Sequence, residues 1–164
     1  MKKLLKLSKG NKKLSKDTLI LSLPAGLTCP GSNSCKAWVT LKDDKRTLNR
    51  GVESEFTCFA ASEELRYPNV YKSRRYNLNS INSYVINKDV NGLTNLLNDS
   101  LQAKNKNINK FRIHESGDFY NIIYLKAWLN VARFNKDIKF YCYSKSLNFF
   151  LETLLPSNFY LTAS

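Results

Sequence analysis

Hydrophobic and polar residues alternate in blocks along the second half of the chain, and the blocks predict strands and helices in turn. Residues 110–115 (KFRIHE), 138–143 (IKFYCY) and 159–163 (FYLTA) are typical of strands. Between them, residues 120–134 and 147–155 place apolar side chains at helical spacing. Strands separated by helices form two successive βαβ units, which pair in parallel with right-handed crossovers. The pattern predicts an α/β fold, built as either a partial (β/α) barrel or an open sheet.

The first half of the chain adds a buried strand, a hairpin and three helices to this prediction. Residues 18–23 (TLILSL) form an apolar run that ends in a Pro-Ala-Gly loop. Residues 36–56 indicate a hairpin or an irregular excursion, with the polar residues 42–45 as its turn. Helical patterns then begin at Cys58, run from Pro68 to about residue 80, and cover residues 89–103.

These elements make up one predicted domain of residues 18–164, behind a basic N-terminal arm of residues 1–17. A length of 164 residues suits a single hydrophobic core. The chain stops directly after the strand of residues 159–163, without the helix that would complete a sheet or barrel. We therefore expect the α/β domain to be truncated at its C-terminus.

The apolar segments are too short for a membrane span, and the cysteines are too few for a secreted scaffold. No apolar run approaches the roughly 18 residues needed to cross a bilayer. The basic start is followed by neither a long apolar stretch nor a small-residue cleavage site. Four irregularly spaced cysteines do not form a disulfide framework. The sequence predicts a cytoplasmic protein without a membrane partner.

The net charge of +13 indicates an anionic partner, for which nucleic acid or a nucleotide is the natural choice. Seven lysines fall within the first sixteen residues with no acid among them, and of these Lys12 and Lys13 are predicted to contact the nucleic acid. A second basic group, formed by Lys72, Arg74 and Arg75, lies beside two tyrosines, which suits phosphate contact with base stacking. The alternatives are a solvated lysine tail and an ordinary charged helix face.

Three cysteines, Cys29, Cys35 and Cys58, have the spacing C-x5-C-x22-C and predict a metal site. Thiolates are soft ligands for iron–sulfur clusters and for zinc. Cys29 and Cys35 share a loop rich in Pro, Gly, Ser and Asn, while Cys58 precedes a helix whose N-terminus favours a thiolate. Three protein ligands leave a fourth position open. The alternative is unrelated buried thiols, which is also how Cys142 is interpreted.

His114, the one histidine, lies at the end of a predicted strand, where it suits a general base, a metal ligand or a substrate donor. A strand histidine satisfied by its neighbours is the plain alternative. Strict alternation would place Arg112, His114 and Ser116 on one face of that strand, opposite Glu115.

The loops after parallel strands converge at the carboxyl edge of a sheet, which predicts a ligand pocket there. Besides His114, its catalytic candidates are Ser116, Asp118 and Lys145, and its cofactor-binding candidates are Gly117, Tyr143 and Ser144. Asp118 is explained equally as the N-cap of the next helix or as a ligand for a ribose or amine. Lys145 either meets a phosphate or carboxylate or is simply exposed.

Four segments, LPAGLTCPGSNSCKAW, FTCFAASEELRYPNVYKSR, FRIHESGDFY and YCYSKSL, together resemble the gene product 88 family of bacteriophages and mobile elements, to which no function is assigned. The resemblance spans residues 21–164, and family members generally extend further. The family is distantly similar to radical S-adenosylmethionine enzymes, which use a partial (β/α) barrel and three cysteines that hold a [4Fe–4S] cluster. Their compact C-x3-C-x2-C spacing is replaced here by the wider one.

The first hypothesis is a phage-encoded metal or iron–sulfur enzyme, radical-S-adenosylmethionine-like, that acts on nucleic acid or a nucleotide in the host cytoplasm. Its cofactors would be an iron–sulfur cluster, with zinc as the alternative, and S-adenosylmethionine. The second hypothesis is a non-catalytic, basic nucleic-acid-binding protein with structural zinc or no metal. A third hypothesis is a small protein that interacts with a host factor. The one sequence feature that supports it is the exposed charge.

Overall fold

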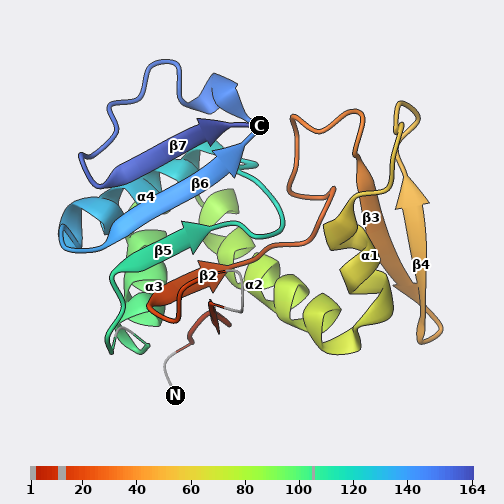
Figure 1. The fold of residues 1–164 in the computed structure, drawn as a ribbon, viewed down its shortest axis with the longest axis horizontal. Helices are drawn as coiled ribbons and strands as arrows, with labels where there is room; N and C mark the ends of the chain where they lie inside the picture. Colours follow the sequence, from red (N-terminus) through yellow and green to blue (C-terminus); the bar gives the residue numbers. More distant parts are fainter. Residues whose placement is uncertain (1–2, 11–13, 105) are drawn as a thin grey trace.

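A computed structural model describes residues 3–10, 14–104 and 106–164, and within these residues the chain forms a five-stranded sheet in the order β1-β2-β5-β6-β7. Short β1 (Ser8–Lys9) runs antiparallel to β2 (Thr18–Leu21). The remaining strands all continue parallel to β2 (Figure 1); they are β5 (Lys110–Ile113), β6 (Lys139–Ser144) and β7 (Phe159–Ala163). The predicted α/β fold with parallel pairing is confirmed as an open sheet, and the described strands do not close into a barrel.

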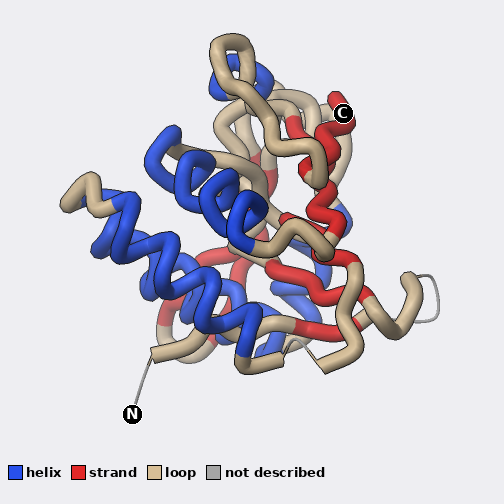
Figure 2. Tube along the Cα trace, turned by 90° about the vertical axis from the view of Figure 1, so that its left-hand side faces the viewer, coloured by secondary structure: helices blue, strands red, loops and turns tan. Residues whose placement is uncertain are grey.

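The three longer helices that follow β2 and β5 pack on the same face of this sheet. Each parallel strand is added on the same side of the previous one, and right-handed crossovers then place their helices on the same face. Figures 1 and 2 show this arrangement for α2 (Pro68–Ile86), α3 (Val90–Gln102) and α4 (Ile122–Phe134). The core lies between these layers, where Trp128 of α4 packs 4.9 Å from Phe111 of β5, measured between ring centroids.

A second, smaller unit stands beyond the carboxyl ends of the parallel strands (Figure 1). It consists of the hairpin β3 (Ala37–Lys42) and β4 (Lys45–Arg50) with helix α1 (Phe59–Arg66). The hairpin prediction is confirmed, and its two-residue turn has the positive φ angles of a type I′ turn, 48° and 58°. Small side chains pack the unit against the loop after β2, namely Ala25, Ala37, Ala60 and Ala61.

The basic N-terminal segment is part of the packed body over residues 3–10. Leu5 and Leu7 are buried in the main core, and the Leu5 backbone N–H donates to Ser100 Oγ at 2.8 Å. The Asn77 side chain exchanges hydrogen bonds of 2.8 and 2.9 Å with the Lys6 backbone. Residues of the predicted N-terminal arm therefore already pack in the hydrophobic core, ahead of the predicted domain start at residue 18. Lys12 and Lys13, which were predicted to contact nucleic acid, lie outside the described residues.

The helix predicted over residues 147–155 is wrong. Only a single 3₁₀ turn, η1 (Leu147–Phe149), forms there, and the crossover from β6 to β7 is otherwise irregular. Its apolar spacing is helical, but Leu151 and Leu154 are 81% and 88% exposed, so no core face stabilises a helix. In the described residues, no helix combines the length and apolar character that crossing a membrane requires.

Candidate functional site at the carboxyl edge of the sheet

Asp118 joins the loops that follow three parallel strands. Its Oδ1 accepts hydrogen bonds from Ser144 Oγ at 2.6 Å and from its neighbour's backbone N–H at 2.7 Å, and its Oδ2 accepts from the Lys145 N–H at 2.8 Å. The Asp118 N–H in turn donates to the Thr28 carbonyl at 3.0 Å. The loops after β2, β5 and β6 are thus tied together through one buried carboxylate.

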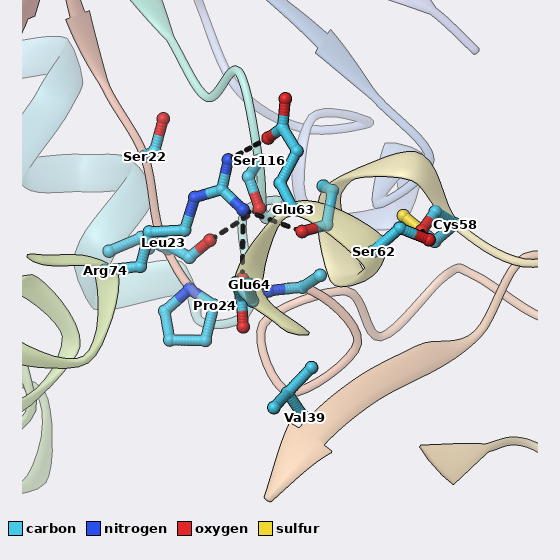
Figure 3. Close-up of polar contacts among 12 residues, drawn as sticks. Ser22, Leu23, Pro24, Val39, Cys58, Ser62, Glu63, Glu64, Arg74 and Ser116 are labelled. Atoms are coloured by element: carbon cyan, nitrogen blue, oxygen red, sulfur yellow. Dashed lines mark hydrogen bonds and ion pairs between the residues drawn. The ribbon is translucent and has the colours of Figure 1, made fainter. Parts of the chain in front are cut away.

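The prediction that Asp118 caps the following helix is wrong. Helix α4 begins at Ile122, and its N-cap is Asn121, whose side chain accepts from the Ile123 N–H at 2.8 Å. The helix starts later than the polar turn suggested, which leaves the Asp118 carboxylate for contacts between loops. The Ser116 side chain also joins two loops, since its Oγ donates to the Leu23 carbonyl at 2.8 Å (Figure 3).

Two glycines allow these loops to approach closely. Gly117 has φ +85°, and a Cβ added there would lie 2.5 Å from Thr28 Oγ1. A Cβ at Gly31 would lie 2.5 Å from the Lys145 carbonyl oxygen. Gly117, a candidate for cofactor contact, therefore packs against the loop after β2, and Gly31 brings the cysteine loop directly onto the end of β6.

Replacement of Gly117 by alanine should lower the free energy of unfolding by about 2–3 kcal/mol, since left-handed strain and a steric clash add together. Gly51→Ala is the matched control, because Gly51 has no left-handed φ and its added Cβ would meet only the Lys36 side chain, at 3.1 Å. Urea unfolding followed by circular dichroism measures both. Equal losses for the two variants would contradict the interlocked packing around Gly117.

Three half-buried free thiols gather at this edge. Cys29 lies in the loop after β2, Cys35 follows in the same loop, and Cys58 is the N-cap residue of α1, as predicted. Burial raises the pKa of the Cys29 thiol to about 12, and negative charge on Asp118, Cys58 and Cys35 acts in the same direction. The three cysteines are therefore electrostatic neighbours, and Cys29 stays a protonated thiol unless a cation offsets its burial.

The present arrangement stops short of a formed metal centre. Among the described residues, no three His, Cys, Asp or Glu side chains are grouped closely enough to hold an ion. The donor type nevertheless fits a thiophilic metal, and the position of a cysteine sulfur depends on one rotatable side-chain bond, χ1. Cys142 is different, because it is 1% exposed within the core, as expected for a packing thiol.

A surface hollow of about 420 Å³ opens beside the cysteine loop. Lys145 and Cys35 border it, and its other lining residues are Gly31, Asn33, Ser34 and Phe56. The Lys145 side chain is exposed, so its ammonium is available to an anion in the hollow. Ser144 is buried beneath it and is fully engaged with Asp118 and the Ser146 N–H, at 2.6 and 3.0 Å.

His114 lies away from solvent among aromatic rings. Its φ of 71° ends the strand at Ile113, so the alternation that placed it beside Arg112 is wrong, and its side chain instead enters the helix-covered core. The Nε2 atom is 2.9 Å from Tyr124 Oη, and Phe119 packs edge-on against the ring. Burial lowers the pKa of His114 to about 4, although Asp118 opposes the shift, so the imidazole is neutral at pH 7.

Comparison with known proteins identifies the family of this chain. A family model described as Gene product 88 matches residues 5–164, which is nearly the whole chain. The chain belongs to the Gene product 88 family. The resemblance read from the four sequence segments is thereby confirmed. No curated protein and no solved structure matched the chain.

In this Gene product 88 protein, a buried ion pair fixes α1 against the loop that carries Cys29. Glu64 is fully buried, and its Oε1 accepts from the Ala25 N–H at 2.8 Å and from Arg74 Nη1 at 3.2 Å. Arg74 Nη1 also donates to the Ala60 carbonyl at 2.8 Å, and Nη2 donates to Glu63 Oε2 at 2.7 Å (Figure 3). Burial raises the pKa of Glu64, while the Ala25 N–H and Arg74 oppose that rise.

The prediction that Arg74 contacts nucleic acid is therefore wrong, because the residue is 4% exposed and its guanidinium is bonded inside the protein. Arg75 Nη2 donates to the Val39 carbonyl at 2.6 Å, and its guanidinium lies 5.1 Å from the Tyr71 ring centroid. Lys72 remains exposed on α2. Sequence reasoning missed the role of Glu64, although two adjacent glutamates one helix away from two arginines were the available signal.

Proposed function

We propose that this protein is a phage metal or iron–sulfur enzyme that acts on a nucleic acid or nucleotide at the carboxyl edge of its sheet. Cys29, Cys35 and Cys58 would hold the metal. The observation that supports the proposal is that Cys29 lies near enough to Cys58 and Cys35 for their charge to act on its thiol, although the three are not grouped at ligand distance. A cation would offset the burial and the mutual charge that keep Cys29 protonated. When bound, the metal would supply Lewis-acid or electron-transfer chemistry.

The chain's own residues would bind and orient the substrate. Lys145, exposed at the hollow, would bind a phosphate or carboxylate, and Asn33 and Ser34, which also line the hollow, would offer polar contacts. Asp118, held by three donors, would act as a positioning residue that fixes the Lys145 backbone. His114 is neutral and buried against Tyr124, so we assign it to the support of the loop rather than to substrate contact.

The test is metal content after anaerobic purification. The wild-type protein should retain close to one metal ion or cluster per chain, and Cys29→Ser, Cys35→Ser and Cys58→Ser should each lose most of it. Cys142→Ser is the matched control, since it removes a core thiol and should leave the metal in place. Metal-free wild-type protein, or equal metal content in Cys29→Ser and Cys142→Ser, would contradict the proposal.

The same anaerobically purified protein shows whether the bound group is an iron–sulfur cluster or zinc. Brown colour with acid-labile sulfide would assign an iron–sulfur cluster, and a colourless zinc protein would assign the alternative ligand. Titration with S-adenosylmethionine then tests the radical chemistry that the distant resemblance implies. If S-adenosylmethionine leaves the spectrum of the cluster unchanged, the proposed radical chemistry is contradicted, but the proposed metal site is not.

A further inference from the structure

The face of the sheet that lies opposite the helices carries aromatic and basic side chains. In Figure 1, α3, α4 and the later turns of α2 lie behind the sheet, and Figure 2 shows helices gathered on one side of the strands. Alternation along the strands turns a second set of side chains to the other side, which we call the tyrosine face: Lys110, Arg112, Lys139, Tyr141, Tyr143 and Tyr160.

The register of the strands sets three of these side chains in a row. Arg112 of β5 is paired with Tyr141 of β6, which is paired with Tyr160 of β7. Adjacent strands are about 4.8 Å apart, so the row spans roughly 10 Å across the sheet. Tyr143 lies two residues further towards the carboxyl edge, on the same face as Tyr141.

These rings are presented to solvent rather than packed. Tyr143 and Tyr160 are 50% and 51% exposed, so about half of each side chain is open to solvent. The Arg112 guanidinium lies 5.7 Å from the Tyr143 ring centroid, a cation–π distance that holds the charge at the surface. Its buried Nε has no protein partner in the described structure.

The charge on this face is mostly positive. Lys110 and Lys139 are paired in register at the end of the strands away from the cysteines. Lys110 is 3.7 Å from Asp17, which it neutralises, and Glu115 is the other carboxylate close to the tyrosines. Phosphates would therefore meet Arg112 and Lys139 beside the rings.

We infer that the tyrosine face binds single-stranded nucleic acid, with bases stacked on Tyr143 and Tyr160 and phosphates held by Arg112 and Lys139. Open sheets with exposed aromatics stack two or three unpaired bases in this way, and nearby cations follow the backbone. A duplex hides its base faces, so exposed rings that stack on bases select the single strand. The inference uses none of the cysteines and stands independently of the metal site.

Tyr143 connects the tyrosine face to the candidate site at the carboxyl edge of the sheet. It is followed in the chain by Ser144 and Lys145, and the latter lines the hollow beside Cys35. A single-stranded nucleic acid bound across the tyrosine face would thus extend towards the carboxyl edge of the sheet, where the proposed metal site lies. The face supplies binding on its own, whether or not a reaction follows.

The experiment is fluorescence anisotropy with a labelled twelve-nucleotide oligothymidine, its RNA counterpart and a matched duplex. Tyr143→Thr and Tyr160→Thr keep strand propensity but remove the rings, and each should weaken single-strand binding roughly 10-fold or more. Tyr143→Phe keeps a stacking surface and should bind as the wild type does. Tyr67→Ala is the matched control, since Tyr67 is 50% exposed with Arg66 6.0 Å from its ring but lies next to α2.

The outcomes separate stacking from general attraction to phosphate. Selective loss in the two threonine variants, with tighter binding of single strands than of the duplex, supports the inference. Unchanged binding in both threonine variants, or duplex binding as tight as single-strand binding, would overturn it and leave only the overall charge of +13. Cys29→Ser should bind normally, so loss of the metal and loss of this surface are distinguishable.

Discussion

Replacement of Arg74 by alanine should lower the free energy of unfolding by about 3–5 kcal/mol, because it leaves the Glu64 carboxylate buried without its cation. The guanidinium also satisfies the Ala60 carbonyl, which would lose its partner. The loss matters for the site because this network anchors α1, and with it Cys58, to the loop after β2. Urea unfolding monitored by circular dichroism at pH 7 gives the value.

The two glutamates that contact Arg74 provide the control. Glu63 is 42% exposed in its side chain, and Glu63→Ala should cost less than about 1 kcal/mol, as surface ion pairs do. In a double-mutant cycle, Arg74→Met combined with Glu64→Leu should be less destabilised than the sum of the single variants. Additive losses, or an Arg74→Ala loss no larger than that of Glu63→Ala, would show that the pair is solvated.

His114 should make the fold sensitive to mild acid. Its pKa in the folded protein is about 4, below the ordinary value of 6.5, so the unfolded chain takes up the proton first as the pH falls. The neutral imidazole therefore contributes stability that is complete above pH 6.5 and declines towards pH 4, by about 3 kcal/mol over that interval. Buried carboxylates add their own dependence, which makes a comparison with a variant necessary.

His114→Asn is the variant of choice, since asparagine tolerates the left-handed backbone at this position. It should be less stable than the wild type at pH 7.5, because it loses ring packing against Phe119, but its stability should fall less between pH 7.5 and 4. Urea midpoints at several pH values measure both slopes. Parallel slopes for the two proteins would mean that His114 titrates normally in the folded state.

The sequence was sufficient for the parts of the fold that hydrophobic periodicity controls. Alternation in β6 and the helical stripe of α4 predicted a parallel α/β arrangement, and Cys58 was correctly placed at the start of a helix. The prediction failed over residues 147–155, where the apolar spacing was helical but no core surface was available to bury it. Hydrophobic periodicity shows which residues could lie on one face of a helix or strand. It does not show whether another element packs against that face.

The candidate site was harder to predict, because its contacts join residues far apart in the chain. A left-handed φ at His114 reversed the side-chain direction that alternation implied, and no local pattern signals that angle in a histidine. Asp118 had the sequence context of a helix cap but bonds to Lys145, 27 residues away. Arg74 looked like an exposed cation, because charge in a sequence does not reveal burial.

The central claim is that Cys29, Cys35 and Cys58 bind one metal ion or cluster at the carboxyl edge of the sheet. X-ray absorption at the metal edge of the anaerobically purified protein tests it most directly. The proposal predicts a shell of sulfur neighbours at about 2.3 Å, as zinc thiolates show, and fewer of them in Cys29→Ser. A metal surrounded only by nitrogen and oxygen, or a sulfur shell unchanged in all three serine variants, would contradict it.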